Sequence, residues 1–413
     1  MAKFSSVIAV AIQLAVALLF AGCSATMGNE PVNTASIAHG PSVPAARSVG
    51  QRAQDAKIAL ILPLSATGEA GEIARSMKQA AELALFDADN PNVHLVVKDD
   101  RGTPDGAATA TQAAIADGAE IILGPLFAKS VAAAAPVARK SGVSIVSFSN
   151  DPSVAGNGVY LMSYLAAEEV NRVISFAASK GKRRFAALIP SSPYGQTVEP
   201  AFRKAVASAG GEIVTLEYFA ADTTGMLASA KRVVSVMNEA EKEGHPVDAL
   251  FVPAGPEAIA QLSPLLTYSG IDTHKVKLLG TSALDMPVLS RNEQLIGSWY
   301  AAPDASGFKV FSEKFAASFG KPPPRLATLA YDSMSAALTL AKGSKEDRFS
   351  AASLTRASGF AGVDGLLRLQ PNGLVDRSLA IFEIEKYRSV VIDAAPQPGS
   401  DKISAASALA KFF

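Results

Sequence analysis

Short apolar runs alternate with longer amphipathic stretches from about residue 57 onward. Four runs in the first third predict buried strands: KIALILPL (57–64), VHLVVKDD (93–100), AEIILGP (119–125) and VSIVSFS (143–149). The stretches between them predict helices: GEIARSMKQAAELALFDA (71–88), TPDGAATATQAAIADG (103–118) and SVAAAAPVARKSG (130–142). Thr103 suits the N-cap of the second helix, and Gly118 suits its stop.

The alternation restarts after Tyr164. The predicted helices are EEVNRVISFAASKG (168–181), GQTVEPAFRKAVASAGG (195–211), MLASAKRVVSVMNEAEKEG (226–244) and PEAIAQLSPLLTYSG (256–270). The predicted strands are RFAALIPS (184–191), EIVTLEYF (212–219), DALFVPA (248–254) and VKLLGTS (276–282). Strands that alternate with helices indicate parallel sheets covered on both faces, which bind ligands outside the carboxyl ends of their strands. The body, about 57–395, is long enough for two such units with a cleft between them.

The first residues read as an export signal. Val7 to Ala21 is apolar except for Gln13, which is short for a membrane span but suits a secretory signal peptide over residues 1–22. Cys23, the single cysteine of the chain, follows the small residues Ala21 and Gly22. This arrangement resembles a bacterial lipobox, and it implies acylation of Cys23; the alternative is a free buried cysteine.

Two details bear on the anchor. Phe20 stands where a lipobox usually has leucine, and Leu19 is one residue further back. Ser24 follows the cysteine, where aspartate would be the inner-membrane retention signal, so we expect a lipid-anchored protein facing the periplasm from the outer membrane. Residues 23–56 are rich in Ser, Ala, Pro, Gly and Asn and predict a flexible tether, and 396–413 form a C-terminal tail.

Charge and motifs exclude several classes of function. The 38 basic and 38 acidic residues cancel, and no basic stripe is present, so we expect no nucleic-acid partner. The four histidines (His39, His94, His245, His274) have no metal-ligand spacing. The chain has no G-x-S-x-G elbow and no Walker phosphate loop, and GEAG after the first strand is only a tight loop. We therefore expect a non-enzyme without catalytic residues, metal or cofactor.

An ordered set of segments carries a family resemblance. The segments are IALILPLSATGEAG, LVVKDDRGTPDGAATATQAAIADGAEIILGPL, APVARKSGVSIVSFSND, SSPYGQ, SWYAAPD, FAASFGKPPPRLATLAYDSMSAAL and GVDGLLRLQPNGLVDRSLAIFEI. Together they resemble the leucine-binding protein family of type I periplasmic binding proteins over essentially the whole body. The segments LPLS, GPL and SFSND also resemble penicillin-binding protein activator lipoproteins, whose relevant domain shares this fold.

The resemblance implies an α/β type I periplasmic-binding-protein fold. Two doubly wound, Rossmann-like lobes would be joined by three hinge crossings and close around a ligand. Lobe 1 would comprise 57–165 plus 301–360, and lobe 2 would comprise 166–300 plus 361–395. The first two crossings would fall near Ser163-Tyr164 and Ala301-Ala302.

The resemblance also implies ligand-cleft residues in lobe 1. Family members hold a ligand carboxylate at a helix N-terminus with nearby hydroxyl groups. The matching stretch is GPLFAKSV, where Ala128 replaces the usual serine, with Lys129 and Ser130 beside it. The loop after the fourth strand offers Ser149, Asn150 and Asp151; Asp151 could instead cap a short turn before Pro152. Ser65, after the first strand, could contact a ligand or cap the next helix.

In lobe 2 the implied cleft residues are Tyr194, Gly255, Ser282 and Asp285. Tyr194 could stack on a ligand or only shape its loop. Gly255, or Pro256, stands where relatives have an aromatic residue. Amino-acid binders place an acid near Ser282 to hold the ligand ammonium group, since a buried ammonium needs a carboxylate partner. Here the nearest acid is Asp285, so the full clamp is missing.

Two functions follow from these features. The first is capture of a small polar, amino-acid-like solute for an ABC permease. The second is regulation of a peptidoglycan synthase through protein contacts. Both fit a membrane-tethered lipoprotein; the first predicts a polar cleft, and the second predicts a degenerate clamp.

Overall fold

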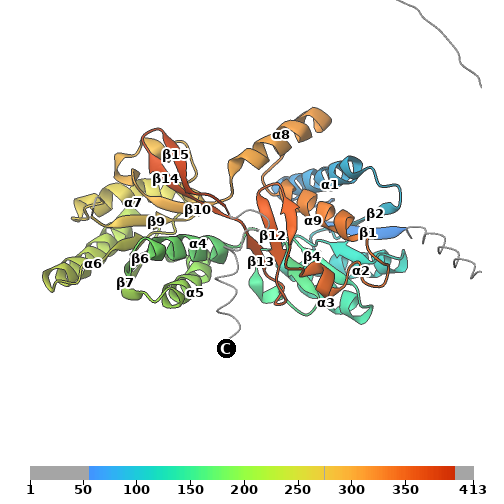
Figure 1. Cartoon of the computed structure of the whole chain (residues 1–413), viewed down its shortest axis with the longest axis horizontal. Coiled ribbons are helices and arrows are strands. Elements are labelled where there is room, and N and C mark those ends of the chain that lie inside the picture. The colour runs from blue at the N-terminus through green and yellow to red at the C-terminus, as the bar shows by residue number, and fades with distance from the viewer. Residues whose placement is uncertain (1–54, 274, 396–413) are drawn as a thin grey trace, which may run out of the picture. The chain divides into compact units, whose positions relative to one another are not determined.

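The computed structural model describes residues 55–273 and 275–395 (Figure 1). The predicted signal peptide, the acylation of Cys23, nearly all of the tether and the tail lie outside these residues. Within the described ranges, no helix combines the length and the apolar character that a membrane crossing needs.

The first sheet is parallel and has the strand order β2-β1-β3-β4-β5. Its strands are β1 Ala56–Leu62, β2 Val93–Asp99, β3 Ile121–Leu123, β4 Ser144–Ser147 and β5 Val159–Leu161. The connecting helices are α1 Gly68–Ala88, α2 Pro104–Ala116 and α3 Ala128–Lys140, with a 3-10 turn, η1, at Pro152–Val154. The first strand thus lies between the second and the third, so the winding direction reverses between β1 and β3.

The second sheet repeats this order and adds an antiparallel edge: β15-β14-β10-β9-β8-β6-β7. Its strands are β6 Arg184–Pro190, β7 Glu212–Phe219, β8 Ala249–Phe251, β9 Lys277–Gly280, β10 Trp299–Ala302, β14 Ala380–Glu385 and β15 Arg388–Asp393. Its helices are α4 Ala166–Ser179, α5 Pro193–Ser208, α6 Thr223–Lys242 and α7 Pro256–Tyr268, followed by the turns η2 Ser282–Leu284, η3 Leu289–Arg291 and η4 Glu293–Leu295. The winding direction of this sheet reverses between β6 and β8.

The remaining elements belong to the lobe of the first sheet and pack against its hydrophobic cluster. They are α8 Ala305–Phe319, α9 Ala327–Leu340, α10 Ala351–Leu354 and a small antiparallel sheet of β11 Phe360–Gly362, β12 Gly365–Leu369 and β13 Val375–Arg377. Helix α9 packs against α1, while α2 packs against α3. The chain passes between the two large sheets after β5, after β10 and after β13.

The structure places two segments in a different lobe from the one expected. Residues 361–377 were expected in lobe 2, but Leu367, Leu369 and Val375 are buried in the same hydrophobic cluster as the first sheet. Residues 301–302 were expected in lobe 1, but they belong to β10, which pairs with β9 and β14. The physical reason is the same in both cases: the apolar faces of these short strands find their partners through long-range packing that periodicity does not encode.

The buried strands explain the continuous apolar runs. In β6, Ala186 and Leu188 face one hydrophobic cluster, while Phe185, Ala187 and Ile189 face another. Successive side chains of a strand point to opposite faces, so a strand covered by helices on both faces must be apolar throughout.

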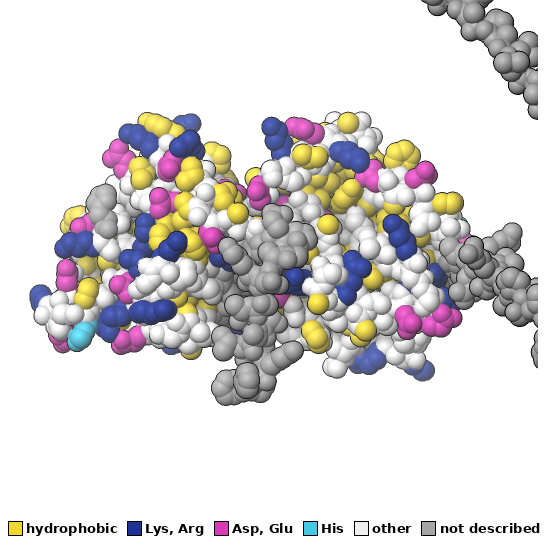
Figure 2. Space-filling model, viewed as in Figure 1, with side chains coloured by type: hydrophobic (Ala, Val, Ile, Leu, Met, Phe, Trp, Pro, Cys, Tyr) yellow, Lys and Arg dark blue, Asp and Glu magenta, His cyan; other side chains and the backbone are white. Residues whose placement is uncertain are grey.

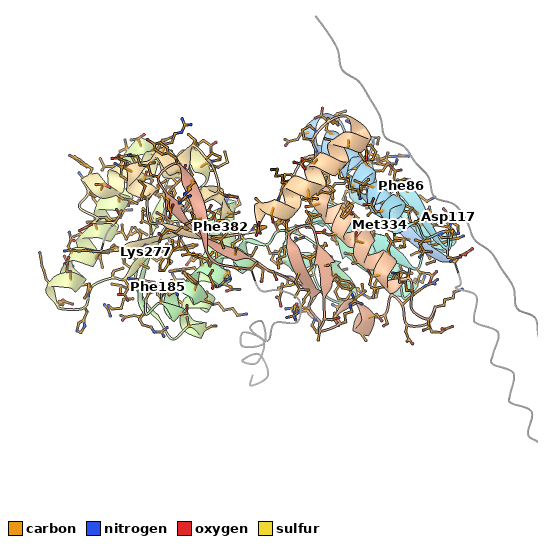
Figure 3. All side chains as sticks on the ribbon, turned by 45° about the horizontal axis from the view of Figure 1, so that its top comes forward. Phe86, Asp117, Phe185, Lys277, Met334 and Phe382 are labelled. Carbon is orange, nitrogen blue, oxygen red and sulfur yellow. The ribbon has the colours of Figure 1, made fainter. Side chains whose placement is uncertain are left out.

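Four of the side chains labelled in Figure 3 illustrate the packing. Met334 of α9 is fully buried against the first sheet, and Phe382 of β14 stacks on Tyr300 with ring centroids 5.2 Å apart. Lys277 lies 4.6 Å from the centre of the Trp299 ring, and Asp117 at the end of α2 pairs with Lys98 at 2.6 Å. Basic and acidic side chains are interspersed on the visible face (Figure 2).

Candidate functional site

A groove of about 1100 Å³, lined by polar and apolar groups in similar measure, opens at the carboxyl ends of the strands of both large sheets. Its lining residues are Asn150, Asp151, Pro152, Tyr164, Ala166, Glu169, Pro190, Ser192, Pro193, Tyr194, Gln196, Thr197, Gly255, Thr281, Ser282 and Ala283. Most of them lie in loops that follow β4, β6, β8 and β9 or in the first turns of the next helices. A doubly wound sheet binds ligands at this edge, because the loops there diverge where the winding direction reverses.

The second sheet supplies a carboxylate that sequence reasoning missed. Glu169, in the first turn of α4, accepts hydrogen bonds from the Ser282 backbone N–H to Oε2 at 2.8 Å and from the Ser282 hydroxyl to Oε1 at 2.7 Å. Burial raises the pKa of Glu169, and the two hydrogen bonds from Ser282 oppose that shift. Ser282 therefore stands at the position expected for an acid and holds an acid that arrives from another helix.

The sequence signal for Glu169 is local and weak. The pair Glu168-Glu169 follows the first crossing and begins a helix, where carboxylates are common because they favour the helix dipole. Only the fold brings this turn of α4 next to Ser282, 113 residues further along the chain.

Tyr194, Gly255 and Ser282 are sequence-predicted residues that line the groove from the second sheet. The Tyr194 hydroxyl donates to Thr281 Oγ1 at 3.3 Å, and the side chain is 39% exposed. Gly255 is the N-cap of α7. Tyr194 lies in the first turn of α5, a helix that Ser192 caps by accepting from the Gly195 N–H.

Asn150 and Asp151 line the groove from the first sheet. Asp151 accepts from the Ser153 N–H at 2.9 Å and so caps η1, and its own N–H donates to the Ser149 hydroxyl at 3.1 Å. Ser149 is buried and supports the loop from beneath. Asp151 therefore caps η1 and also lines the groove.

The other predicted residues are not among those that line the groove. Ser65 is exposed after β1, where its N–H donates to Asp99 at 3.3 Å. Ala128 and Lys129 begin α3, and the fully buried Ser130 hydroxyl has no hydrogen-bond partner among the described atoms. Asp285 is exposed and accepts from the Tyr300 hydroxyl at 2.9 Å, so its carboxylate is engaged outside the groove.

A buried charged cluster lies beside the groove, where the crossing segments meet. Tyr164, on the first crossing, donates from its hydroxyl to Asp364 Oδ2 at 2.6 Å, and Arg325 binds the other oxygen of Asp364 at 2.8 Å. The Arg377 guanidinium lies 4.4 Å from the centre of the Tyr164 ring. Burial raises the pKa of Tyr164, so its hydroxyl remains a donor at physiological pH.

Arg377 ties the first crossing to the third. It ends β13, and its Nε donates to the carbonyl oxygen of Ser163 at 2.8 Å. Its Nη1 lies 3.9 Å from Oδ2 of Asp332, a fully buried carboxyl whose Oδ1 accepts from the Val363 N–H at 2.7 Å. Burial raises the pKa of Asp332 to about 7, although Arg377 opposes that shift. These contacts connect the first crossing to the third through Asp332 of α9.

Among the described residues, no group of three or more His, Cys, Asp or Glu side chains is placed to hold a metal ion. The chemistry available in the groove is recognition of polar and charged groups by two carboxylates, hydroxyls and amides.

Similar solved structures share this architecture. A branched-chain amino acid ABC transporter protein from Rhodospirillum rubrum is 22% identical, with a TM-score of 0.70, over 82% of this chain and 100% of that one. A leucine-binding protein from Thermotoga maritima is 21% identical, with a TM-score of 0.53, over 83% and 99%. An ABC transporter substrate-binding protein from Desulfitobacterium hafniense, in complex with Leu, is 17% identical, with a TM-score of 0.55, over 82% and 100%.

Sequence comparison gives one relative and one family match. An uncharacterised protein from Rickettsia prowazekii is 22% identical over 237 residues, which cover 56% of this chain and 62% of the relative. The family model described as periplasmic binding protein matches residues 55–388. The chain therefore belongs to the periplasmic binding protein family and has its leucine-binding-like, two-lobed type I fold.

Proposed function

We propose that the protein binds a small polar, amino-acid-like solute in the groove and delivers it to an ABC permease. The observation that carries this proposal is the carboxylate of Glu169, which lines the groove and is fixed by Ser282. The similar structures described as a branched-chain amino acid ABC transporter and as an ABC transporter substrate-binding protein support the transport role, which we therefore prefer to regulation of a peptidoglycan synthase.

Glu169 would receive the amino group of the solute. Each of its oxygens accepts one hydrogen bond from Ser282, and a carboxylate oxygen has a second lone pair to offer. Since Ser282 holds the carboxylate in place, little conformational freedom is lost when an ammonium group binds. The hydroxyls of Thr197 and Thr281 and the amide of Gln196 are further polar partners in the same groove.

Closure would bring Asn150 and Asp151 onto the solute. These residues belong to the first sheet, whereas Glu169 belongs to the second, so a rotation about the three crossings changes the distance between them. The buried cluster around Tyr164 would act as the hinge. A solute that contacts both sides favours the closed form by its greater affinity for it.

Replacing Glu169 by glutamine tests the role of the carboxylate. The variant keeps the size of the side chain and removes its charge, so we expect the affinity for a bound amino acid to fall about tenfold or more. Titration calorimetry with a panel of free amino acids measures the change. The control is Glu239→Gln on α6, an exposed acid outside the groove. Equal affinities of both variants would remove Glu169 from the proposed site.

We further propose that Cys23 carries the lipid anchor and that the mature protein faces the periplasm from the outer membrane. The apolar run before Cys23 and the small residues next to it support this proposal. Mass spectrometry of the protein purified from its own cells should find cleavage before Cys23 and acyl chains on it, and Cys23→Ala should abolish both and release the protein from membranes. An unmodified cysteine at the mature position would contradict it.

A further inference from the structure

The charged residues that line the groove are all acidic. Among its described lining residues, Asp151 and Glu169 are acids, and none is lysine or arginine. Two arginines lie close by, next to the Tyr164 ring. Arg377 is only 8% exposed and donates to Ser163, and the charge of Arg325 is paired with the carboxylate of Asp364 at 2.8 Å. A cleft lined by one sign of charge concentrates ligands of the opposite sign. The field inside the groove therefore favours positive charge.

The expected partner for a ligand carboxylate is missing from the groove. Ala128, Lys129 and Ser130 occupy the position that the family resemblance assigns to that task, but none of them lines the groove. Ala128 has no hydroxyl, and the hydroxyl of Ser130 is fully buried. A carboxylate bound between Asp151 and Glu169 would meet two like charges and no cation among the lining residues, which disfavours its desolvation. Arg325, beside the groove, is already paired with Asp364.

Other lining groups also suit a cation. Tyr194 is 39% exposed, and the faces of aromatic rings attract ammonium groups. Asp151 uses one oxygen, Oδ1, to cap η1, and its second oxygen remains to accept from a ligand. Hydroxyls and amides can accept from the N–H groups of an amine as readily as they donate.

We propose that the groove selects a solute with a net positive charge: an amine whose carboxylate is absent or masked as an amide. The inference rests on the proposed function, because it concerns the solute that the same groove captures. Among amino-acid-like solutes, the groove would bind the cationic ones. Asp151, on the side of the first sheet, and Glu169, on the side of the second, would together select cations over zwitterions.

Calorimetry on the wild-type protein with three probes tests the inference. L-leucine is a zwitterion, L-leucinamide has the same side chain without the carboxylate charge, and putrescine is a diamine. We expect L-leucinamide to bind about tenfold or more tightly than L-leucine, with an affinity that falls as salt is added. We also expect Asp151→Asn, which retains an oxygen to cap η1, to reduce the preference, while Glu239→Gln leaves it unchanged.

The outcomes separate the inference from the proposed function. If L-leucine binds as tightly as L-leucinamide or more tightly, the groove accepts zwitterions, so the inference fails and the proposed function stands. If none of the three probes nor any free amino acid binds, both fail. If putrescine binds and L-leucinamide does not, the result supports selection by charge and shows that the groove does not accept the leucine side chain.

Discussion

Replacing Arg377 by methionine is expected to lower the free energy of unfolding by about 3–5 kcal/mol at pH 8. The guanidinium is buried, faces the buried carboxyl of Asp332 at 3.9 Å, and donates to the Ser163 carbonyl at 2.8 Å. Methionine fills similar space but leaves Asp332 without its cation and Ser163 without its donor. Removal of one partner from a buried pair costs far more than exchange of the whole pair for apolar residues. Denaturant unfolding followed by circular dichroism measures the loss.

The control for this substitution is Arg388→Met on β15. Arg388 is exposed and pairs with Glu385, three residues before it, so its replacement should change stability by no more than about 0.5 kcal/mol. The hinge role adds a second readout, since Arg377→Met should also change the rate of closure on a bound solute. An Arg377→Met protein as stable as the wild type would mean that the buried cluster contributes little to holding the crossings together.

Stability is expected to fall by about 2–4 kcal/mol as the pH rises from 5 to 8, because two carboxyls, one fully buried and one half-buried, must lose their protons in the folded protein. Burial raises the pKa of Asp332 from 3.8 to about 7. Burial, together with the charge of Asp376, raises the pKa of Glu168 from 4.5 to about 8. Between these values the folded chain keeps protons that the unfolded chain has released, so stability present at low pH is lost as the pH passes the folded-state pKa. Since the Glu168 side chain is only half-buried, the expected range is below the sum of the two shifts.

Unfolding curves at pH 5, 6, 7 and 8 measure this dependence. Glu168→Gln is neutral at every pH and should flatten the curve while raising stability at pH 8. Asp332→Asn should flatten it further, because asparagine does not ionise. Its side-chain oxygen can still accept from the Val363 N–H, so the substitution keeps this hydrogen bond. The matched Glu239→Gln variant on α6 should follow the wild type. A wild-type stability that is constant or rises between pH 5 and 8 would show that these carboxyls ionise freely in the folded state.

Part of the candidate site could be predicted from the sequence, because parallel strands end at the same edge of a sheet. Asn150, Asp151, Tyr194, Gly255 and Ser282 follow predicted strands, and all five line the groove. Whether they bind a solute remains a prediction. Ser65, Asp285 and the residues that begin α3 also follow strands, but their side chains have other positions. Strand ends specify an edge, and they do not specify which loops bend toward the groove.

Glu169 shows most directly why the site could not be completed in advance. A search for an acid after VKLLGTS finds Asp285, whose carboxylate accepts from Tyr300. The carboxylate that lines the groove comes from α4 and is held by Ser282. A carboxylate was therefore expected next to Ser282, and one is present there, but it comes from α4 and not from the segment that follows β9.

The sequence by itself determined the alternation of strands and helices, the continuous apolar runs of strands such as β6, and the cap of α2 at Thr103, because each depends on neighbours within a few residues. The family resemblance supplied the two-lobed fold, which the family match confirms. Only the tertiary structure decided that β11–β13 pack in the lobe of the first sheet, that Arg377 donates to Ser163 across 214 residues, and that Ser282 donates to Glu169. These contacts depend on which buried surfaces and polar groups satisfy one another after the chain has folded, and such long-range pairing leaves no periodic trace in the sequence.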